Sequence, residues 1–197
     1  MAPRELRPAL SAPPELLLRA QGLRSAIFDV DGVLTDGRLY IGEDGESFKA
    51  FHVLDGHGIK LLARAGIEPV VITGRDSPAV RRRLGDLGVA EAHFGVADKL
   101  AVAQALLNER GWTWPEVAVI GDDWPDLPLM VRAGLACAPA NAHAEAKAVA
   151  HHVCTLRGGE GAAREFCDLL LMGAGRYARL LQGHLQTLDD GRAAAGA

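Results

Sequence analysis

The stretch AIFDVDGVLTDGRLY, residues 26–40, begins with a run of apolar residues and then places three aspartates close together. The apolar run has the length and composition of a buried β-strand. Asp29 and Asp31 follow it with one residue between them, and Asp36 comes shortly after. Two neighbouring carboxylates repel each other unless a cation lies close to both. The stretch therefore predicts either a polar turn or a metal-assisted site at the carboxyl end of a strand.

The composition is that of one globular domain. Of the 197 residues, 49 % are hydrophobic and 23 % are charged, and the net charge is −4. These values are ordinary for a folded domain and disfavour a nucleic-acid partner. Cys137, Cys154 and Cys167 are widely spaced and form no C-x-x-C pair, so we expect buried thiols in a reducing compartment. We expect no signal peptide and no membrane span, which favours a cytoplasmic protein.

Apolar segments of strand length alternate with amphipathic helical segments along most of the chain. The expected strands are residues 25–30, 67–73, 116–123, 135–140 and 151–155. The expected helices are residues 14–22, 55–66, 77–88, 97–111 and 141–150. Such alternation predicts an α/β fold, a Rossmann-like parallel sheet flanked by helices. Ser77 is the expected N-cap of its helix, and Gly66 is the expected end of another.

One segment, residues 38–53, breaks this alternation. Its sequence RLYIGEDGESFKAFHV contains two half-apolar runs joined by glycines and acidic residues, which is typical of a β-hairpin. Because it follows the first aspartates, we expect it to project beside the site that they form. We divide the chain into a leader of residues 1–22, partly disordered or a short helix, a main domain of residues 23–175, and a C-terminal helix with a flexible tail, residues 176–197.

Polar side chains follow three of the expected strands, at the edge where open α/β sheets bind ligands. They include carboxylates, a hydroxyl and cations: Asp29, Asp31, Thr73, Arg75, Lys99, Asp122, Asp123 and Asp126. Clustered carboxylates bind Mg²⁺, whose charge allows an aspartate to attack a phosphate dianion. A second carboxylate two residues further on can protonate the leaving alkoxide, while Thr73 and Lys99 hold the phosphoryl oxygens. These groups therefore favour phosphoryl transfer.

Four motifs carry a family resemblance. FDVDGVLTDG, VVITGR, GVADKL and VIGDDWPDLPLM resemble, in this order, the motifs of the haloacid-dehalogenase-like (HAD) phosphatase superfamily. Together with the hairpin, FHVLDGHGIKLL and GGEGAAREFCDLLL, the resemblance runs from about residue 25 to about residue 172. It is closest to the branch without a cap domain, and there to the family of 3-deoxy-D-manno-octulosonate (KDO) 8-phosphate phosphatases, which act in lipopolysaccharide precursor synthesis.

This resemblance implies a role for each motif residue. Asp29 would be the nucleophile that becomes an aspartyl-phosphate. Asp31 would be general acid and then general base, and would give Mg²⁺ its main-chain oxygen. Asp122 would be the third protein ligand of the metal, after Asp29 and Asp31, with Asp123 and Asp126 behind it. The residues implied to contact the substrate are Asp31, Gly32, Thr73, Gly74, Arg75 and Lys99.

The resemblance also implies how the site is covered. The 44 residues from Asp29 to Thr73 leave room for the hairpin but not for a cap domain. Family members form homotetramers in which a neighbouring subunit covers the site, and their C-terminal tail can enter an active site. This would make Arg157 and Arg164 candidates for contact with the substrate.

Because of two departures from the family pattern, the sequence is compatible with more than one substrate. Leu54 and Glu160 stand where many relatives have arginine, so an alternative substrate is another acidic sugar phosphate, such as a nine-carbon ulosonate 9-phosphate.

Two non-enzymatic alternatives remain. A phosphoaspartate receiver also has acidic residues, threonine and lysine at one edge, but it needs no general acid at the position of Asp31. A catalytically silent assembly domain is disfavoured because every motif residue is present. His151 and His152 lack helical i, i+4 spacing and nearby partners in the sequence, so we expect a surface or strand pair rather than a metal site.

Overall fold

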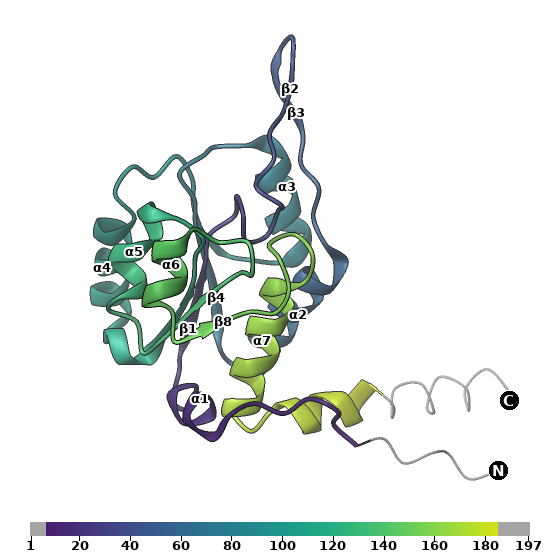
Figure 1. The fold of residues 1–197 in the computed structure, drawn as a ribbon, viewed down its shortest axis with the longest axis vertical. Coiled ribbons are helices and arrows are strands. Elements are labelled where there is room, and N and C mark those ends of the chain that lie inside the picture. Colours follow the sequence, from purple (N-terminus) through teal and green to yellow (C-terminus); the bar gives the residue numbers. More distant parts are fainter. Residues whose placement is uncertain (1–6, 185–197) are drawn as a thin grey trace, which may run out of the picture.

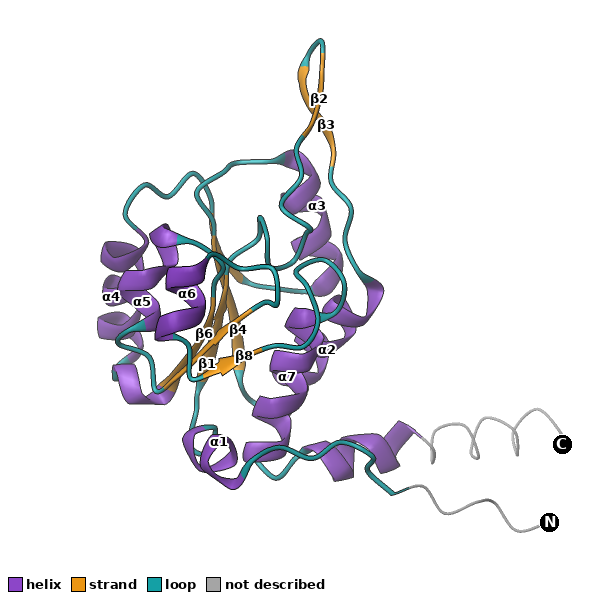
Figure 2. Cartoon of the chain, in the orientation of Figure 1, coloured by secondary structure: helices purple, strands orange, loops and turns teal. Residues whose placement is uncertain are grey.

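The computed structural model describes residues 7–184 and contains a parallel sheet with helices on both faces (Figures 1 and 2). The sheet has six strands in the order β5-β4-β1-β6-β7-β8. Their bounds are β1 Ser25–Phe28, β4 Glu68–Ile72, β5 Glu91–His93, β6 Val117–Ile120, β7 Leu135–Ala138 and β8 His152–Val153. The predicted α/β fold class is confirmed.

The helices form two layers, one on each face of the sheet (Figure 2). One face is covered by α1 Pro14–Arg19, α2 Val53–Ala65, α3 Pro78–Leu87 and α7 Ala162–Gly173. The other is covered by α4 Lys99–Arg110, α5 Leu127–Met130 and α6 Ala144–Val149. Short 3-10 turns lie at Trp114–Glu116 and Trp124–Asp126, and residues 177–184 are helical. In the part of the chain from residue 7 to residue 184, no helix is long and apolar enough to cross a membrane.

Side chains of the central strand β1 alternate between the two cores. Phe28 packs edge-on against Phe166 of α7, with ring centroids 5.4 Å apart, whereas Ile27 belongs to the core on the opposite face. This alternation is expected of a strand that is buried on both sides. Burial of the apolar β1 segment is therefore what fixes Asp29 at its carboxyl end.

The register of β1 with its neighbours sets where the loops after β1, β4 and β6 begin. Phe28 pairs with Val71 of β4 and with Ile120 of β6, both in parallel register. Because parallel strands that are aligned in this way end at the same edge, the residues that follow them lie close together. The sheet thus gathers the predicted polar residues at one place.

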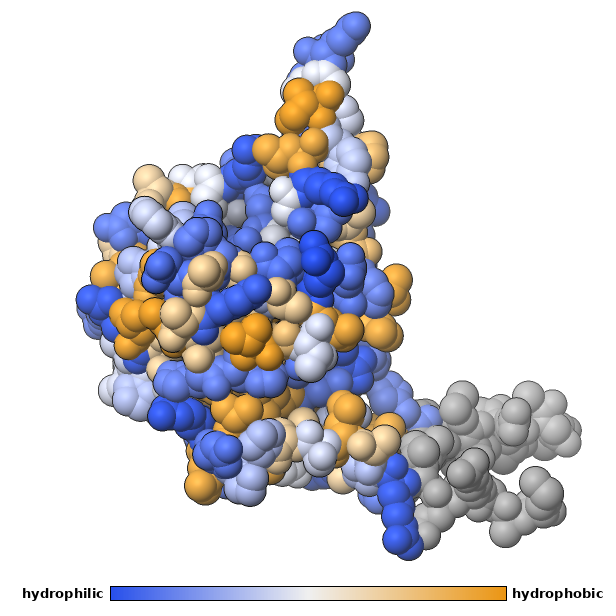
Figure 3. Space-filling view, in the orientation of Figure 1, coloured by the Kyte–Doolittle hydropathy of each residue, from blue (hydrophilic) through white to orange (hydrophobic). Residues whose placement is uncertain are grey.

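A hairpin projects from the body of the protein at this edge (Figure 1). Its strands, β2 Tyr40–Gly42 and β3 Gly45–Phe48, pair with each other and form a separate antiparallel sheet. The rings of Tyr40 and Phe48 stack with centroids 4.3 Å apart, and Ile41 is 65 % exposed. In Figure 3 hydrophobic side chains gather on the part of this hairpin next to the body of the protein, below a hydrophilic tip. The predicted hairpin is confirmed.

Several local predictions can be compared with the structure. Gly66 ends α2 in the left-handed conformation, with φ 82°, as predicted. Ser77 occupies the N-cap position of α3, but its side chain caps no backbone N–H and instead donates to Glu46 in the hairpin. The elements β5, α5 and α7 were not predicted. Residues 1–6 of the predicted leader and residues 185–197 of the predicted tail lie outside the described residues, and the three-part division stays a prediction.

The Gly-Gly segment before α7 packs against the loop that follows Asp31 in the same chain. The N–H of Gly159 donates to the Val33 carbonyl at 3.0 Å, and the N–H of Gly158 donates to Asn141 Oδ1 at 2.7 Å. A Cβ atom on Gly158 would lie 1.7 Å from the carbonyl oxygen of Gly32. A side chain cannot fit there, so glycine allows the two backbones to approach.

Gly158→Ala should therefore destabilise the protein by about 1–3 kcal/mol or more, because the added methyl group forces the two loops apart. The matched control is Gly85→Ala in α3, where an added Cβ meets nothing within 4 Å. That variant should stabilise the helix by about 0.5–1 kcal/mol. Urea unfolding followed by circular dichroism measures both. Equal stability of the two variants would contradict this close packing of the two loops.

Candidate active site

The predicted site residues line one cleft at the carboxyl edge of the sheet. It has a volume of about 440 Å³ and lies between the loops that follow β1, β4 and β6 and the start of α4. The lining residues include Asp29, Asp31, Thr73, Gly74, Arg75, Lys99, Asp122, Asp123 and Asp126. Gly32 lies against the cleft, since a Cβ atom there would come within 2.0 Å of Asp122 Oδ2.

Lys99 is a buried cation among these carboxylates. Its Nζ donates to Asp29 Oδ1 at 2.6 Å and to Asp126 Oδ1 at 2.7 Å. Burial alone would lower the pKa of this ammonium, but the two carboxylates raise it above its ordinary value. Helix α4 fixes the lysine at its first residue, because Asp98 caps the helix by accepting from the N–H of Ala101 at 3.0 Å. The ammonium form of Lys99 is thus favoured beside Asp29.

Asp126 shapes the turn that presents Asp122. Its Oδ2 accepts from the N–H of Asp122 at 3.1 Å and from that of Asp123 at 3.4 Å. Gly121 permits this close packing, because a Cβ atom there would lie 2.3 Å from the Cβ of Asp126. Asp126 therefore bridges Lys99 and the loop after β6, while the side chain of Asp123 stays exposed.

Ionisation of Asp29 and Asp122 is costly in the metal-free site, because the side chains around them do not fully balance a negative charge there. Burial and the neighbouring Asp126 raise the pKa of Asp29 to about 6, although Lys99 opposes this shift. Burial, together with Asp29, Asp126 and Asp123, raises the pKa of Asp122 to about 8. One oxygen each from Asp29, Asp122 and Asp126 lie within 4.8 Å of one another. Oxygen donors with unbalanced charge fit a hard divalent cation.

Thr73 and Arg75 flank the carboxylates from the loop after β4. Thr73 is buried, and its backbone N–H donates to the carbonyl of His93 at 3.0 Å. Arg75 is half-exposed, with Nε 3.9 Å from Asp31 Oδ2. A hydroxyl in the wall of a carboxylate cleft and a cation at its mouth can bind the oxygens of a phosphoryl group or another anion.

Lys49 is a site residue that sequence reasoning missed. It follows β3 in the hairpin, and its Nζ donates to Asp31 Oδ1 at 2.5 Å and lies 3.1 Å from Glu46 Oε2. Burial alone would lower the pKa of Lys49, but hydrogen bonds to Asp31 and Glu46 raise it. No spacing rule connects a hairpin lysine with a carboxylate 18 residues earlier, so the sequence offered no signal.

The arginines proposed for substrate contact lie elsewhere. Arg157 is exposed, with Nε 3.9 Å from Glu160 Oε1, and Arg164 Nε donates to Asp168 Oδ1 at 2.8 Å. Neither arginine lines the cleft of its own chain, and Leu54 and Glu160 do not line it either.

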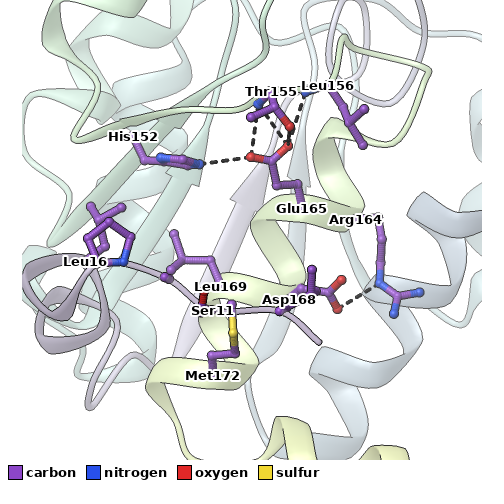
Figure 4. Close-up of a pocket in the computed structure, with 13 residues that line it drawn as sticks. Ser11, Leu16, His152, Thr155, Leu156, Arg164, Glu165, Asp168, Leu169 and Met172 are labelled. Atoms are coloured by element: carbon purple, nitrogen blue, oxygen red, sulfur yellow. Dashed lines mark hydrogen bonds and ion pairs between the residues drawn. The ribbon is translucent and has the colours of Figure 1, made fainter. Parts of the chain in front are cut away.

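A second cavity of about 390 Å³ lies between the leader, α7 and the loop after β8 (Figure 4). Its polar groups are engaged with one another. Glu165 accepts from the N–H groups of Thr155 and Leu156 and lies 3.1 Å from His152 Nε2. His152 begins β8, as the strand alternative for the histidine pair predicted, although the fold gives the pair partners that are distant in the sequence. His152, Cys154 and Glu165 stand close enough to share an ion, but the Cys154 thiol, whose pKa burial raises, donates to the Ala162 carbonyl.

Comparisons with known proteins give a consistent result. The family of haloacid dehalogenase-like hydrolases matches residues 90–166. A 3-deoxy-D-manno-octulosonate 8-phosphate phosphatase from Salmonella typhimurium is 41 % identical over 163 residues, which are 83 % of this chain and 87 % of that protein.

Solved structures agree with this similarity. A probable YrbI family phosphatase from Pseudomonas syringae superposes with a TM-score of 0.86 at 44 % identity, covering 88 % of this chain and 98 % of the other. The 3-deoxy-D-manno-octulosonate 8-phosphate phosphatase from Moraxella catarrhalis, in complex with magnesium ion, phosphate ion and KDO, has a TM-score of 0.84 at 35 % identity, covering 86 % of this chain and 98 % of that one.

Removal of one carboxylate from the cleft should stabilise the metal-free protein increasingly as the pH rises. The pKa of Asp122 is about 8 in the folded protein, above that of an unfolded aspartate. Between about pH 4 and pH 8 the folded state therefore binds more protons than the unfolded chain, and stability falls as the pH rises. The stability gain from Asp122→Asn should grow between pH 5 and pH 8 by about 1 kcal/mol or more, about 2–4 °C in Tm.

Thermal unfolding in chelator at the two pH values measures this gain, and Asp86→Asn on the exposed face of α3 is the control, with no comparable change. Saturating Mg²⁺ should stabilise the parent protein but not Asp122→Asn. A gain that is independent of pH would contradict this charge balance among the carboxylates.

Proposed function

The chain belongs to the haloacid dehalogenase-like hydrolases, within the family of 3-deoxy-D-manno-octulosonate 8-phosphate phosphatases, and we propose that it hydrolyses 3-deoxy-D-manno-octulosonate 8-phosphate to KDO and phosphate. This reaction supplies KDO for lipopolysaccharide precursor synthesis. The observation that carries the proposal is the cleft in which Asp29, Asp31, Thr73, Lys99 and Asp122 converge. The identity to the phosphatases of Salmonella typhimurium and Haemophilus influenzae supports the choice of substrate.

The metal in this proposal is Mg²⁺, which a relative of this chain contains. Asp29, Asp122 and the main-chain oxygen of Asp31 would hold it, and Asp126 would support Asp122 through its contacts with the backbone of the loop after β6. When bound, Mg²⁺ supplies positive charge that lowers the repulsion between the aspartates and a phosphate dianion.

Each protein residue then has a defined task. A carboxylate oxygen of Asp29 forms a bond to phosphorus while the bond from phosphorus to the sugar oxygen breaks. The electron pair of that bond stays on the sugar oxygen, which takes a proton from Asp31 and leaves as an alcohol. Asp31 then accepts a proton from a water molecule whose oxygen attacks phosphorus, and the bond to Asp29 breaks to release phosphate. Lys99, Thr73 and the backbone at Gly32 and Gly74 would hold the phosphoryl oxygens.

Arg75 is our candidate for the residue that binds the sugar carboxylate, the anionic group of the substrate other than the phosphate. It is half-exposed at the mouth of the cleft and is not paired with Asp76, whose carboxylate accepts two hydrogen bonds from Arg81. An arginine guanidinium suits a sugar carboxylate because it can form two parallel hydrogen bonds.

We also propose that the protein assembles as a homotetramer in which neighbouring subunits cover the cleft. The support is the projecting hairpin, on which Ile41 and Phe48 are 65 % and 55 % exposed. Apolar side chains that gather on an exposed element are typical of an interaction surface. We place the enzyme in the cytoplasm, in keeping with buried free thiols at Cys137, Cys154 and Cys167.

Asp29→Asn should abolish turnover and leave the fold intact, because an amide oxygen does not form the aspartyl-phosphate. The assay is phosphate release with Mg²⁺ across a panel of sugar phosphates that includes the eight- and nine-carbon ulosonates. We expect the eight-carbon substrate to have the highest kcat/KM and Asp29→Asn to lose at least about 10⁴-fold. Preference for a nine-carbon ulosonate 9-phosphate would replace the proposed substrate, and full activity of the variant would refute the mechanism.

Ile41→Asp should weaken the assembly at least about 30-fold, because a buried, unpaired carboxylate in an interface is costly. The control is Leu18→Asp. Leu18 is 66 % exposed, and its helix α1 is distant from the hairpin in Figure 1. Light scattering after gel filtration measures both variants. A monomeric parent protein, or a tetramer that survives Ile41→Asp, would contradict the proposed assembly.

A further inference from the structure

The side chain of Lys49 is buried even though the residue belongs to a projecting hairpin. Its side chain is 1 % exposed, while the neighbouring Phe48 is 55 % exposed. Lysine is rarely buried unless it is paired, and phenylalanine is usually buried. The end of β3 thus turns its cation inward and its aromatic ring outward, the reverse of what hydrophobic burial alone would favour.

The partners of Lys49 connect the hairpin to two loops of the cleft. Its ammonium binds Asp31 Oδ1 at 2.5 Å and Glu46 Oε2 at 3.1 Å. The other oxygen of Glu46 accepts from Ser77 Oγ at 2.5 Å. Ser77 is buried at the start of α3, four residues after Thr73. A continuous polar chain, Ser77–Glu46–Lys49–Asp31, therefore joins the loop after β4, the hairpin and the loop after β1.

Lys49 contacts Asp31 from the hairpin, directly after the end of β3. The cleft is lined by Asp31 and Arg75 but not by Lys49. One oxygen of Asp31 is bound to Lys49, and the other, Oδ2, lies 3.9 Å from Arg75 Nε. Lys49 consequently fixes the orientation of the Asp31 carboxyl group while leaving the other oxygen directed to the side where Arg75 lies.

We propose that Lys49 is a positioning residue for the proton transfers made by Asp31, held in place by Glu46 and Ser77. This inference rests on the proposed function, because it assigns Asp31 the proton that moves to the sugar oxygen when the bond from that oxygen to phosphorus breaks. Lys49 holds the carboxyl group within reach of that oxygen. The hairpin is then part of the catalytic apparatus as well as a surface for a neighbouring subunit.

The chemistry of the leaving group makes this role measurable. A sugar alkoxide is strongly basic and leaves only when it is protonated, whereas p-nitrophenolate is weakly basic and leaves without a proton. Positioning of the general acid therefore matters for a sugar phosphate and hardly matters for p-nitrophenyl phosphate. A residue that only stabilises the fold would affect both substrates equally.

The test compares the parent protein, Lys49→Met and the control Lys60→Met, an exposed lysine on α2, on both substrates with Mg²⁺. Methionine keeps the length of the side chain without its charge. We expect Lys49→Met to lower kcat for 3-deoxy-D-manno-octulosonate 8-phosphate by about 10²-fold, and kcat for p-nitrophenyl phosphate by less than about 5-fold. KM should change little, and Lys60→Met should match the parent protein on both substrates.

Three results would overturn the inference alone: equal losses on the two substrates, parent-like rates, or a raised KM at unchanged kcat, which would assign Lys49 to substrate binding. A parent protein that is inactive on every alkyl phosphate would overturn the proposed function and the inference with it.

A second variant keeps the test informative if Lys49→Met does not fold. Glu46→Gln retains the ammonium but weakens its attachment to the hairpin and to Ser77. The variant should lower the ratio of kcat for 3-deoxy-D-manno-octulosonate 8-phosphate to kcat for p-nitrophenyl phosphate by about 3- to 10-fold, the same direction as in Lys49→Met. An unchanged ratio in a folded Glu46→Gln protein would overturn the inference.

Discussion

Repulsion between buried carboxylates is the constraint on which the rest of this structure depends. Asp29, Asp122 and Asp126 share one end of the sheet, and burial increases the cost of their charges. Lys99 offsets part of this cost by binding Asp29 and Asp126, and Lys49 binds Asp31. The balance is incomplete, as the raised pKa values of Asp29 and Asp122 indicate. Carboxyl groups whose ionisation is incompletely balanced by the protein favour the binding of a divalent cation, and through it of an anionic substrate.

This balance works only if the loops approach each other closely, and the backbone provides that approach. Parallel pairing of β1 with β4 and β6 aligns the starts of the loops. Gly32 then lets the first loop pass directly beside the Asp122 carboxylate, and Gly158 packs against the carbonyl oxygen of Gly32. The late Gly-Gly segment therefore supports the first catalytic loop from within the same chain.

Sequence reasoning could predict the features that depend on local pattern. The apolar run before Asp29 predicted the first strand, and the shared edge of parallel strands predicted the meeting of Asp29, Thr73 and Asp122. It could not predict β5 or α5, because three or four residues carry too little periodicity to be distinguished from loops. Ser77 shows a second limit. Its position as N-cap was correct, but tertiary structure offered its hydroxyl a different partner, Glu46 in the hairpin.

The hairpin explains why a small α/β domain can perform this chemistry without a cap domain. The segment between β1 and β4, all of it within the described residues, contains the hairpin and α2. The inner side of the hairpin supplies Glu46 and Lys49 to the polar chain that reaches Asp31, and its outer side presents Ile41 and Phe48. Contact of a neighbouring subunit with that outer side would hold the hairpin, and with it Lys49, against the cleft. Assembly and the orientation of Asp31 would then depend on the same few residues.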